Sequence, residues 1–219
     1  MKSNLVKLLK SVVRRLNANL VPKGQMSKRD GVGRWVITLS SLPSTKTILE
    51  IGVWNGLGTS MLIIQGVKLR NSEPPRIWGL ESNLKMYQIA RKNLSQYKYY
   101  NLIFGSVVKE SELTVDSLSV DESKWLDSDI QSLREAPYIF EELPEKIDLL
   151  ILDGGEFSTY GEFLKLVDRV SSWIILDDTQ TRKCKQVVED LKLNQNFQQV
   201  WASSERNGVA VYFRIPSSV

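Results

Sequence analysis

The sequence predicts a doubly wound α/β sheet that is mostly parallel, has helices on both faces and ends in an antiparallel strand pair. Three observations predict it. Apolar strands and amphipathic helices alternate along the chain, two strands are almost wholly apolar, and the turn Arg206-Asn207-Gly208 separates the last two strands. Continuous apolar strands are typical of parallel sheets covered on both faces, whereas an Asn-Gly turn joins antiparallel neighbours.

The predicted elements follow one another in the order that this fold requires. Strands are predicted at Thr47–Gly52, Arg76–Glu81, Asn101–Phe104, Ile147–Asp153, Trp173–Leu176, Phe197–Ser203 and Gly208–Arg214. Helices are predicted at Val32–Leu42, Thr59–Leu69, Leu84–Leu94, around Val187–Leu191, and over a segment that carries Tyr160, Phe163, Leu164 and Val167. Shorter helical pieces are expected at Ser123–Leu133 and Tyr138–Leu143.

The length of 219 residues suits one α/β domain with additions, and we predict this domain over residues 46–219. Residues 1–45 form a predicted N-terminal helical arm with an apolar stripe of leucines and valines. The stripe favours a packing or dimer contact. The arm is predicted to shape either the entrance for the molecule on which the protein acts or a homodimer interface. The acidic segment from about 106 to 146 is too long for a simple connection, so we expect an insertion at the carboxyl edge of the sheet, where ligands bind.

The charge and composition of the chain narrow the classes of molecule that it can bind. The net charge is +4, but residues 1–34 carry nine basic side chains against one acid, Asp30. A basic arm can meet nucleic acid, an anionic membrane, a nucleotide-linked substrate or the acidic segment of its own fold, and the last two are favoured because aromatic residues are not interleaved with the basic ones. The single cysteine, Cys184, excludes an internal disulfide and fits a reducing, cytoplasmic compartment. No apolar run is long enough to span a bilayer.

The most informative stretch begins at Thr47 and ends at Ser60. It has the pattern of a strand, a glycine turn and a helix start, with Glu50 two residues before the first glycine. Glycines let the backbone turn tightly and approach a ligand closely, and an acid at the end of the next strand, Glu81, suits two ribose hydroxyls. The cofactor-binding candidates are Glu50, Gly52, Trp54, Asn55, Gly56, Thr59, Ser60, Glu81, Ser82, Ser106 and Asp153.

Two further strands end in acids. Asp153 follows one apolar strand, and Asp177 and Asp178 follow the next, so all three are expected in the same crevice at the carboxyl edge. Because the chain has no histidine, a metal site must use oxygen ligands, which favours Mg²⁺ or Mn²⁺ at these three residues. The alternative is that one acid caps a helix, another meets a basic side chain and no metal binds.

The glycine turn and the paired acidic strand ends resemble class I S-adenosylmethionine-dependent methyltransferases, and within them cation-dependent sugar O-methyltransferases. The resemblance covers roughly residues 47–214 and implies a Rossmann-like methyltransferase sheet with S-adenosylmethionine as cofactor. It also implies that the three aspartates hold Mg²⁺ against the acceptor hydroxyls. The sequence departs from the pattern after Asp153, where Gly155 and Glu156 stand in place of a second acid or histidine. The predicted catalytic residues are therefore Asp153 and Glu156, with metal activation alone as a further alternative.

The predicted function is methyl transfer from S-adenosylmethionine to a hydroxyl of a sugar or glycan, assisted by a divalent cation. A hydroxyl is a poor nucleophile while it is protonated, so a Lewis acid and a carboxylate base suit it. Alternatives are a small phenolic or nucleic-acid acceptor, or a cofactor-binding module without catalysis. Thr159 and Glu162 match a capping box at the start of a helix, which assigns both a structural role.

Overall fold

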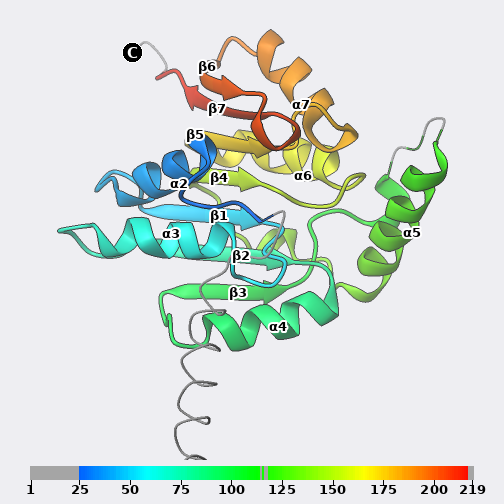
Figure 1. Ribbon diagram of the computed structural model, residues 1–219, viewed down its shortest axis with the longest axis horizontal. Coiled ribbons are helices and arrows are strands. Elements are labelled where there is room, and N and C mark those ends of the chain that lie inside the picture. The colour runs from blue at the N-terminus through cyan, green and yellow to red at the C-terminus, as the bar shows by residue number, and fades with distance from the viewer. Residues whose placement is uncertain (1–24, 114, 116–117, 217–219) are drawn as a thin grey trace, which may run out of the picture.

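The computed structural model describes residues 25–216 except 114, 116 and 117. Its centre is one seven-stranded sheet with helices on both sides (Figure 1). The strand order is β3-β2-β1-β4-β5-β7-β6. The strands are β1 (Thr47–Ile51), β2 (Arg76–Glu81), β3 (Tyr100–Phe104), β4 (Ile147–Leu152), β5 (Val170–Asp177), β6 (Phe197–Ser203) and β7 (Val209–Arg214). The first five pair in parallel, and β7 runs antiparallel to both β5 and β6. The predicted fold class is confirmed.

Helices cover both faces of the sheet, and each face has its own apolar core. The helices are α2 (Gly31–Ser41), α3 (Thr59–Lys68), α4 (Leu84–Leu94), α5 (Val120–Glu135), α6 (Thr159–Leu166) and α7 (Arg182–Leu193). Buried residues of α2, α3 and α4 pack on one face, and those of α6 and α7 pack on the other. Cys184 is a free, fully buried cysteine of the second core.

The register of the parallel strands brings the predicted site residues to one edge. Ile51 of β1 pairs with Leu80 of β2 and with Leu152 of β4, and Leu152 pairs in turn with Leu176 of β5. The residues that follow these positions therefore emerge at the same level of the sheet. This carboxyl edge is where doubly wound sheets bind ligands.

Strand β5 and helix α7 are longer than the sequence pattern predicts, and in both cases a polar side chain at the added end is hydrogen-bonded. Strand β5 begins at Val170 because Ser171 Oγ donates to Asp148 Oδ1 at 2.7 Å, which lets a polar residue continue the strand. Helix α7 begins at Arg182, well before the predicted segment, because the Thr181 side chain accepts from the Lys183 amide and caps the first turn.

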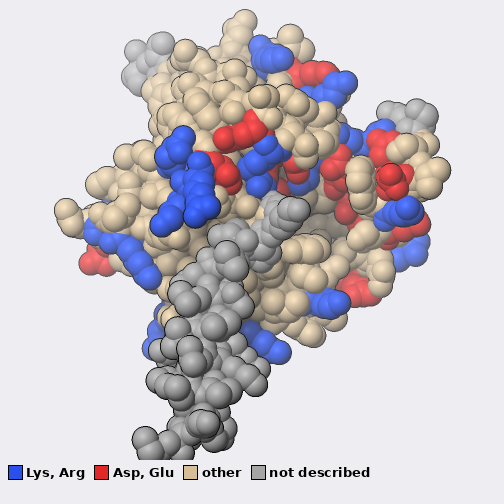
Figure 2. Space-filling view, in the orientation of Figure 1, with Lys and Arg blue, Asp and Glu red and all other residues tan. Residues whose placement is uncertain are grey.

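The segment between β3 and β4 reaches the carboxyl edge through α5. A bridge between Ser106 and Tyr138 closes the two ends of the segment, and the Ser119 side chain caps α5. Acidic and basic side chains are interspersed on α5, at the right of Figure 2. The segment is thus anchored at its base and places a charged helix beside the sheet edge.

The predicted N-terminal arm falls largely on residues 1–24, outside the described residues. Its last part is described, and α2 packs in the same core as α3. The N-terminus of α2 is capped from far along the chain, because Glu205 accepts from the amides of Gly31 and Val32 at 3.0 and 2.8 Å. In the part of the chain that the structure describes, every helix is too short or too polar to cross a membrane.

Candidate functional site

The glycine turn after β1 is built against the end of β4. Gly52 has φ +84°, and a Cβ atom at this position would lie 2.0 Å from the Asp153 carbonyl oxygen. Only glycine fits such a contact, since a side chain would overlap the backbone of the neighbouring strand end. The turn therefore brings Trp54 and Asp153 to the same opening.

Glu50 and Ser60 lie beneath the turn. The fully buried Glu50 carboxylate accepts hydrogen bonds from Ser60 Oγ at 2.9 Å and from the Tyr100 hydroxyl. Burial raises the pKa of Glu50 to about 8. Glu50 and Ser60, both predicted to bind the cofactor, are thus hydrogen-bonded to each other in the core. In this structure they support the turn from below.

Four other predicted cofactor residues also make internal contacts. Asn55 Oδ1 accepts from the Leu57 amide, and the buried Thr59 hydroxyl lies 3.7 Å from the Met26 sulfur. A Cβ on Gly56 would meet Leu94 at 3.0 Å. Ser106 Oγ donates to the Val108 carbonyl at 2.9 Å. None of these four residues lines the cavity described next.

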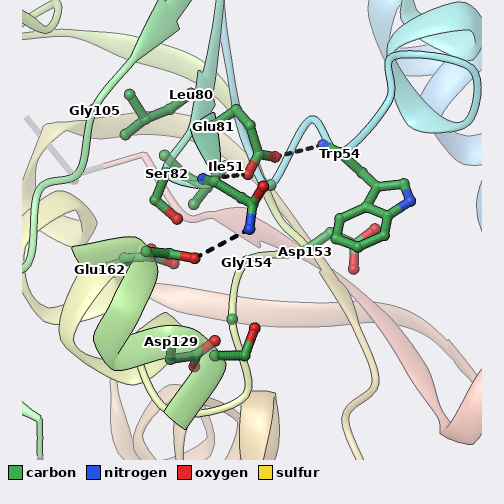
Figure 3. Close-up of a pocket in the computed structure, with 15 residues that line it drawn as sticks. Ile51, Trp54, Leu80, Glu81, Ser82, Gly105, Asp129, Asp153, Gly154 and Glu162 are labelled. Carbon is green, nitrogen blue, oxygen red and sulfur yellow. Dashed lines mark hydrogen bonds between the residues drawn. The ribbon is translucent and has the colours of Figure 1, made fainter. Parts of the chain in front are cut away.

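The cavity lies between β1, β2, β4 and α5, and Glu81 is its central acid (Figure 3). Glu81 Oε2 accepts from the Trp54 amide at 2.6 Å, and Oε1 accepts from the Asn83 amide at 2.7 Å. Burial raises the pKa of Glu81 to about 7. The predicted cofactor residues that line the cavity are Gly52, Trp54, Glu81, Ser82 and Asp153.

The cavity is narrow, with a volume of about 120 Å³. Most ligand pockets measure roughly 300–1,000 Å³, so a complete nucleoside cofactor requires this one to widen. The walls outside the sheet include the half-exposed Trp54, Glu162 of α6, and helix α5, which contributes Ser128, Asp129 and Ser132.

The predicted capping box at Thr159 and Glu162 is wrong. The N-cap residue of α6 is Ser158, and the Thr159 hydroxyl donates to the Gly155 carbonyl at 2.8 Å. Asp129 of α5 instead accepts from the Phe157 amide at 2.8 Å, beside the start of α6. Glu162 does not cap the helix, and it lines the cavity. Asp129 thus holds the segment that precedes α6, and the Thr159 and Glu162 side chains do not cap the helix.

The three predicted metal ligands converge beside the cavity. One carboxylate oxygen from each of Asp153, Asp177 and Asp178 lies within 4.8 Å of the others. Lys183 bridges two of them, with Nζ 3.0 Å from Asp153 Oδ1 and 2.7 Å from Asp178 Oδ2. Arg206 holds the third, with Nη2 2.5 Å and Nε 3.1 Å from the two oxygens of Asp177. Three carboxylates and two protein cations thus form one network.

The electrostatics of this network favour cations. Burial raises the pKa of Asp153, and burial followed by repulsion from Asp153 raises that of Asp177 to about 6. Burial lowers the pKa of Lys183, but Asp153 and Asp178 outweigh it and the net shift is upward. The oxygen donors suit a hard divalent cation, and the ammonium marks a position that binds positive charge. The residues therefore fit such a cation, provided that it displaces Lys183.

Backbone strain gathers at the same place. Trp54, Asp178, Arg206 and Asn207 have φ between +54° and +60°, and they are the non-glycine residues with positive φ in the described chain. Asn207 also donates to Asp178 Oδ1 at 3.1 Å. Sparsely populated conformations of this kind concentrate at functional sites. All four residues border the cavity or the acidic network.

A second, larger cleft lies near the acidic network. It measures about 940 Å³ and lies between α5, α6 and α7. Glu156 lines it, and one Glu156 oxygen accepts from the Lys183 amide at 3.2 Å. Trp125, which is 51% exposed, and Tyr160 provide aromatic surface in the cleft. An ion pair between Arg182 and Glu122 at 3.2 Å connects α7 to α5 across it.

No protein-family model matches the sequence, and no curated protein matches it. Solved structures do match the fold. The O-methyltransferase from Bacillus cereus, solved with S-adenosylhomocysteine, is 15% identical with a TM-score of 0.62, over 94% of this chain and 90% of that one. The chain has the fold of class I O-methyltransferases.

Two further structures show the same relationship. The S-adenosylhomocysteine-bound methyltransferase PaMTH1 from Podospora anserina is 17% identical, with a TM-score of 0.59, over 87% of this chain and 80% of that one. TomG, an O-methyltransferase from Streptomyces achromogenes involved in tomaymycin synthesis and solved with S-adenosylmethionine, is 12% identical, with a TM-score of 0.61, over 89% and 83%. At these identities the likeness concerns the fold.

Sequence reasoning missed Lys183, Arg206, Asp129 and Glu162. Lys183 carried a usable signal, since it lies five residues after Asp178 at the start of a helix. Arg206 stands in the predicted turn between the last two strands, which the sheet order places beside β5. Asp129 had no such signal, because its position depends on how α5 folds back over the edge.

Proposed function

We propose that this chain is an S-adenosylmethionine-dependent O-methyltransferase that acts on a hydroxyl of a small molecule. The observation that carries the proposal is the double position of Asp153. It lines the cavity that contains Glu81, and it belongs to the acidic network. A ligand that reaches from Glu81 to Asp153 therefore ends beside the clustered carboxylates.

The cavity suits the proposed cofactor. Glu81 accepts two backbone amides, and a carboxylate has lone pairs left for the two ribose hydroxyls. The Gly52 turn exposes backbone at the opening. Several buried acids favour a positively charged ligand there. When bound, S-adenosylmethionine supplies a methyl group on a cationic sulfur, which needs in-line orientation more than activation.

Glu156 is the proposed general base for the acceptor hydroxyl. It lines the larger cleft next to the acidic network, whereas Asp153 is already ion-paired with Lys183. A divalent cation held by Asp153, Asp177 and Asp178 would supply Lewis acidity toward the acceptor oxygen. Glu156 then removes the proton from a hydroxyl whose position the cleft determines.

The lining of the cleft supports a sugar or glycan acceptor as the finer proposal. Trp125 offers an aromatic face, and Glu122, Gln186 and Glu189 offer groups that hydrogen-bond to hydroxyls. A small phenolic acceptor is the second candidate. The aromatic side chains of the cleft suit either ring.

The test is methyl transfer from S-[methyl-³H]adenosylmethionine to a panel of sugars, nucleotide sugars and catechols, with and without EDTA. We expect transfer to a hydroxyl compound, its loss in EDTA and its recovery with Mg²⁺ or Mn²⁺. Calorimetry with S-adenosylhomocysteine and NAD accompanies it. Tighter binding of NAD would overturn the methyltransferase proposal, and tight S-adenosylhomocysteine binding without turnover on any acceptor would indicate a module without catalysis.

A further inference from the structure

Three exposed basic side chains lie together at the start of α2, and we call them the basic patch. Lys28 and Arg29 belong to the turn before the helix, and Arg34 belongs to its first turn. Arg34 Nη1 donates to the Arg29 carbonyl at 3.2 Å. The ion pairs in the described part of the chain include none of the three. Figure 2 shows basic side chains gathered over the start of α2, where their charge is open to a ligand.

The backbone that carries the basic patch is held in place. The Ser27 amide donates to Asp30 Oδ2 at 2.7 Å and closes the turn. A Cβ on Gly33 would overlap the Ser27 carbonyl oxygen, so glycine lets this turn fold back onto the helix. Glycine inside a helix costs roughly 1 kcal/mol relative to alanine, and here it permits the close approach. The three cations are thus fixed relative to α2.

The carboxylates around the basic patch already have partners inside the chain. Asp30 accepts from the Ser27 amide and lies in the field of Arg206. Glu205 uses both of its oxygens to accept from the first two amides of α2. Asp177 is held by the Arg206 guanidinium. Because these acids are engaged elsewhere, the cations of the patch are left for a group from outside the chain.

The turn Glu205–Asn207 connects the basic patch with the acidic network and with the larger cleft. Glu205 contacts the start of α2, and Asn207 donates to Asp178 Oδ1 at 3.1 Å. The Asn207 carbonyl accepts from the Gln180 amide at 2.9 Å, and Gln180 lines the larger cleft. A molecule that lies in this cleft with a hydroxyl at Asp178 therefore reaches the basic patch by extending across one turn.

We propose that the basic patch binds a phosphate group of the acceptor and makes the chain select phosphorylated hydroxyl compounds, such as sugar phosphates and nucleotide-linked sugars, over neutral ones. The inference rests on the proposed function, because it takes the acidic network as the place of the reacting hydroxyl. Guanidinium groups match phosphate oxygens with paired N–H donors, and an ammonium adds a point charge. A neutral sugar gains nothing from the same cations, so the patch favours the phosphorylated acceptor.

Isothermal titration calorimetry with sodium pyrophosphate tests the patch directly. The titration is made with S-adenosylhomocysteine bound and in EDTA, so that pyrophosphate carries no divalent cation into the acidic network. We expect the double variant Arg29→Gln/Arg34→Gln to bind pyrophosphate roughly 10- to 100-fold more weakly than the wild type, because two exposed charge-assisted contacts are lost. The matched control, Lys192→Gln, removes an exposed charge from α7 and should bind pyrophosphate like the wild type.

Two further measurements accompany the titration. Both variants should keep the wild-type affinity for S-adenosylhomocysteine, because none of the substituted residues lines the cavity that contains Glu81. In the methyl-transfer panel each sugar is paired with its phosphate and its nucleoside diphosphate ester. We expect kcat/KM to be higher for the phosphorylated compounds, and the double variant to raise their KM while kcat changes little.

The outcomes separate the two proposals. A wild-type chain that does not bind S-adenosylhomocysteine contradicts the proposed function. If it binds this compound, but pyrophosphate is not bound or is bound equally by the double variant, the assignment of the basic patch is overturned and the proposed function stands. A neutral sugar preferred to its phosphate overturns the assignment as well. So does binding to phosphatidylglycerol vesicles that depends on Arg29 and Arg34 without binding of pyrophosphate, which assigns the patch to an anionic membrane surface.

Discussion

Replacing Lys183 by methionine removes the ammonium group that lies between two of the three clustered carboxylates. The side chain is 12% exposed, and Nζ is 3.0 Å from Asp153 and 2.7 Å from Asp178. Methionine keeps an unbranched chain of similar length, so the packing of α7 is largely preserved. The two carboxylates then face each other without their shared cation.

The structure sets the expected magnitude. Removing one partner of a buried ion pair costs roughly 3–5 kcal/mol. The carboxylates here keep 22% and 21% exposure, and Asp178 still accepts from Asn207, so solvent reduces the cost to roughly 2–3 kcal/mol. In a domain of this size that lowers Tm by roughly 4–12 °C. A divalent cation no longer has to displace the ammonium, so its affinity should rise by roughly 30- to 150-fold.

Differential scanning calorimetry in EDTA and in Mg²⁺ or Mn²⁺ measures both effects. We expect Lys183→Met to melt below the wild type in EDTA and to recover when the cation is added. Lys192→Met, an exposed change on the same helix, should leave Tm and cation binding unaltered. The reasoning is refuted if Lys183→Met melts like the wild type and gains no stability from either cation.

Glu81→Ala should weaken S-adenosylhomocysteine binding by roughly 2–4 kcal/mol, because two charge-assisted hydrogen bonds to the ribose are lost; unchanged affinity in calorimetry would remove Glu81 from the site. Glu50→Gln should flatten the pH dependence of stability. The pKa of Glu50 is about 8 in the folded chain against an ordinary 4.5, so its contribution is most favourable below 4.5 and roughly 3–5 kcal/mol is lost as pH rises through this interval. Urea unfolding at pH 5 and pH 8 checks this, and an equal loss in both proteins would contradict it. Glu156→Gln should lower kcat by roughly 10²–10⁴-fold while S-adenosylhomocysteine affinity is retained; wild-type turnover would exclude Glu156 as the base. Gly52→Ala should lower Tm in circular dichroism, since its Cβ would lie 2.0 Å from the Asp153 carbonyl oxygen, and a wild-type melting curve would disprove the close contact.

The fold and the edge that carries the site were predictable from sequence because they depend on local patterns. Apolar runs of strand length, helical periodicity and the Asn-Gly turn are each read within a few residues, and the strand boundaries at Arg76–Glu81 and Phe197–Ser203 agree with the structure. The convergence of the three aspartates was also predictable, since parallel strands in one sheet end at one edge.

What surrounds those carboxylates depends on contacts between distant segments. Lys183 and Arg206 reach the aspartates from α7 and from the turn before β7, and Asp129 reaches the start of α6 from α5. Glu50 matches the sequence motif of a ligand-binding residue, yet its carboxylate accepts a hydrogen bond from Tyr100 of β3, fifty positions away in the chain. Spacing in the sequence predicts where a carboxylate emerges. Which donor it meets is set by side chains that folding brings within hydrogen-bond distance, because charge and hydrogen-bond energies act across a few ångströms of space whatever the separation along the chain.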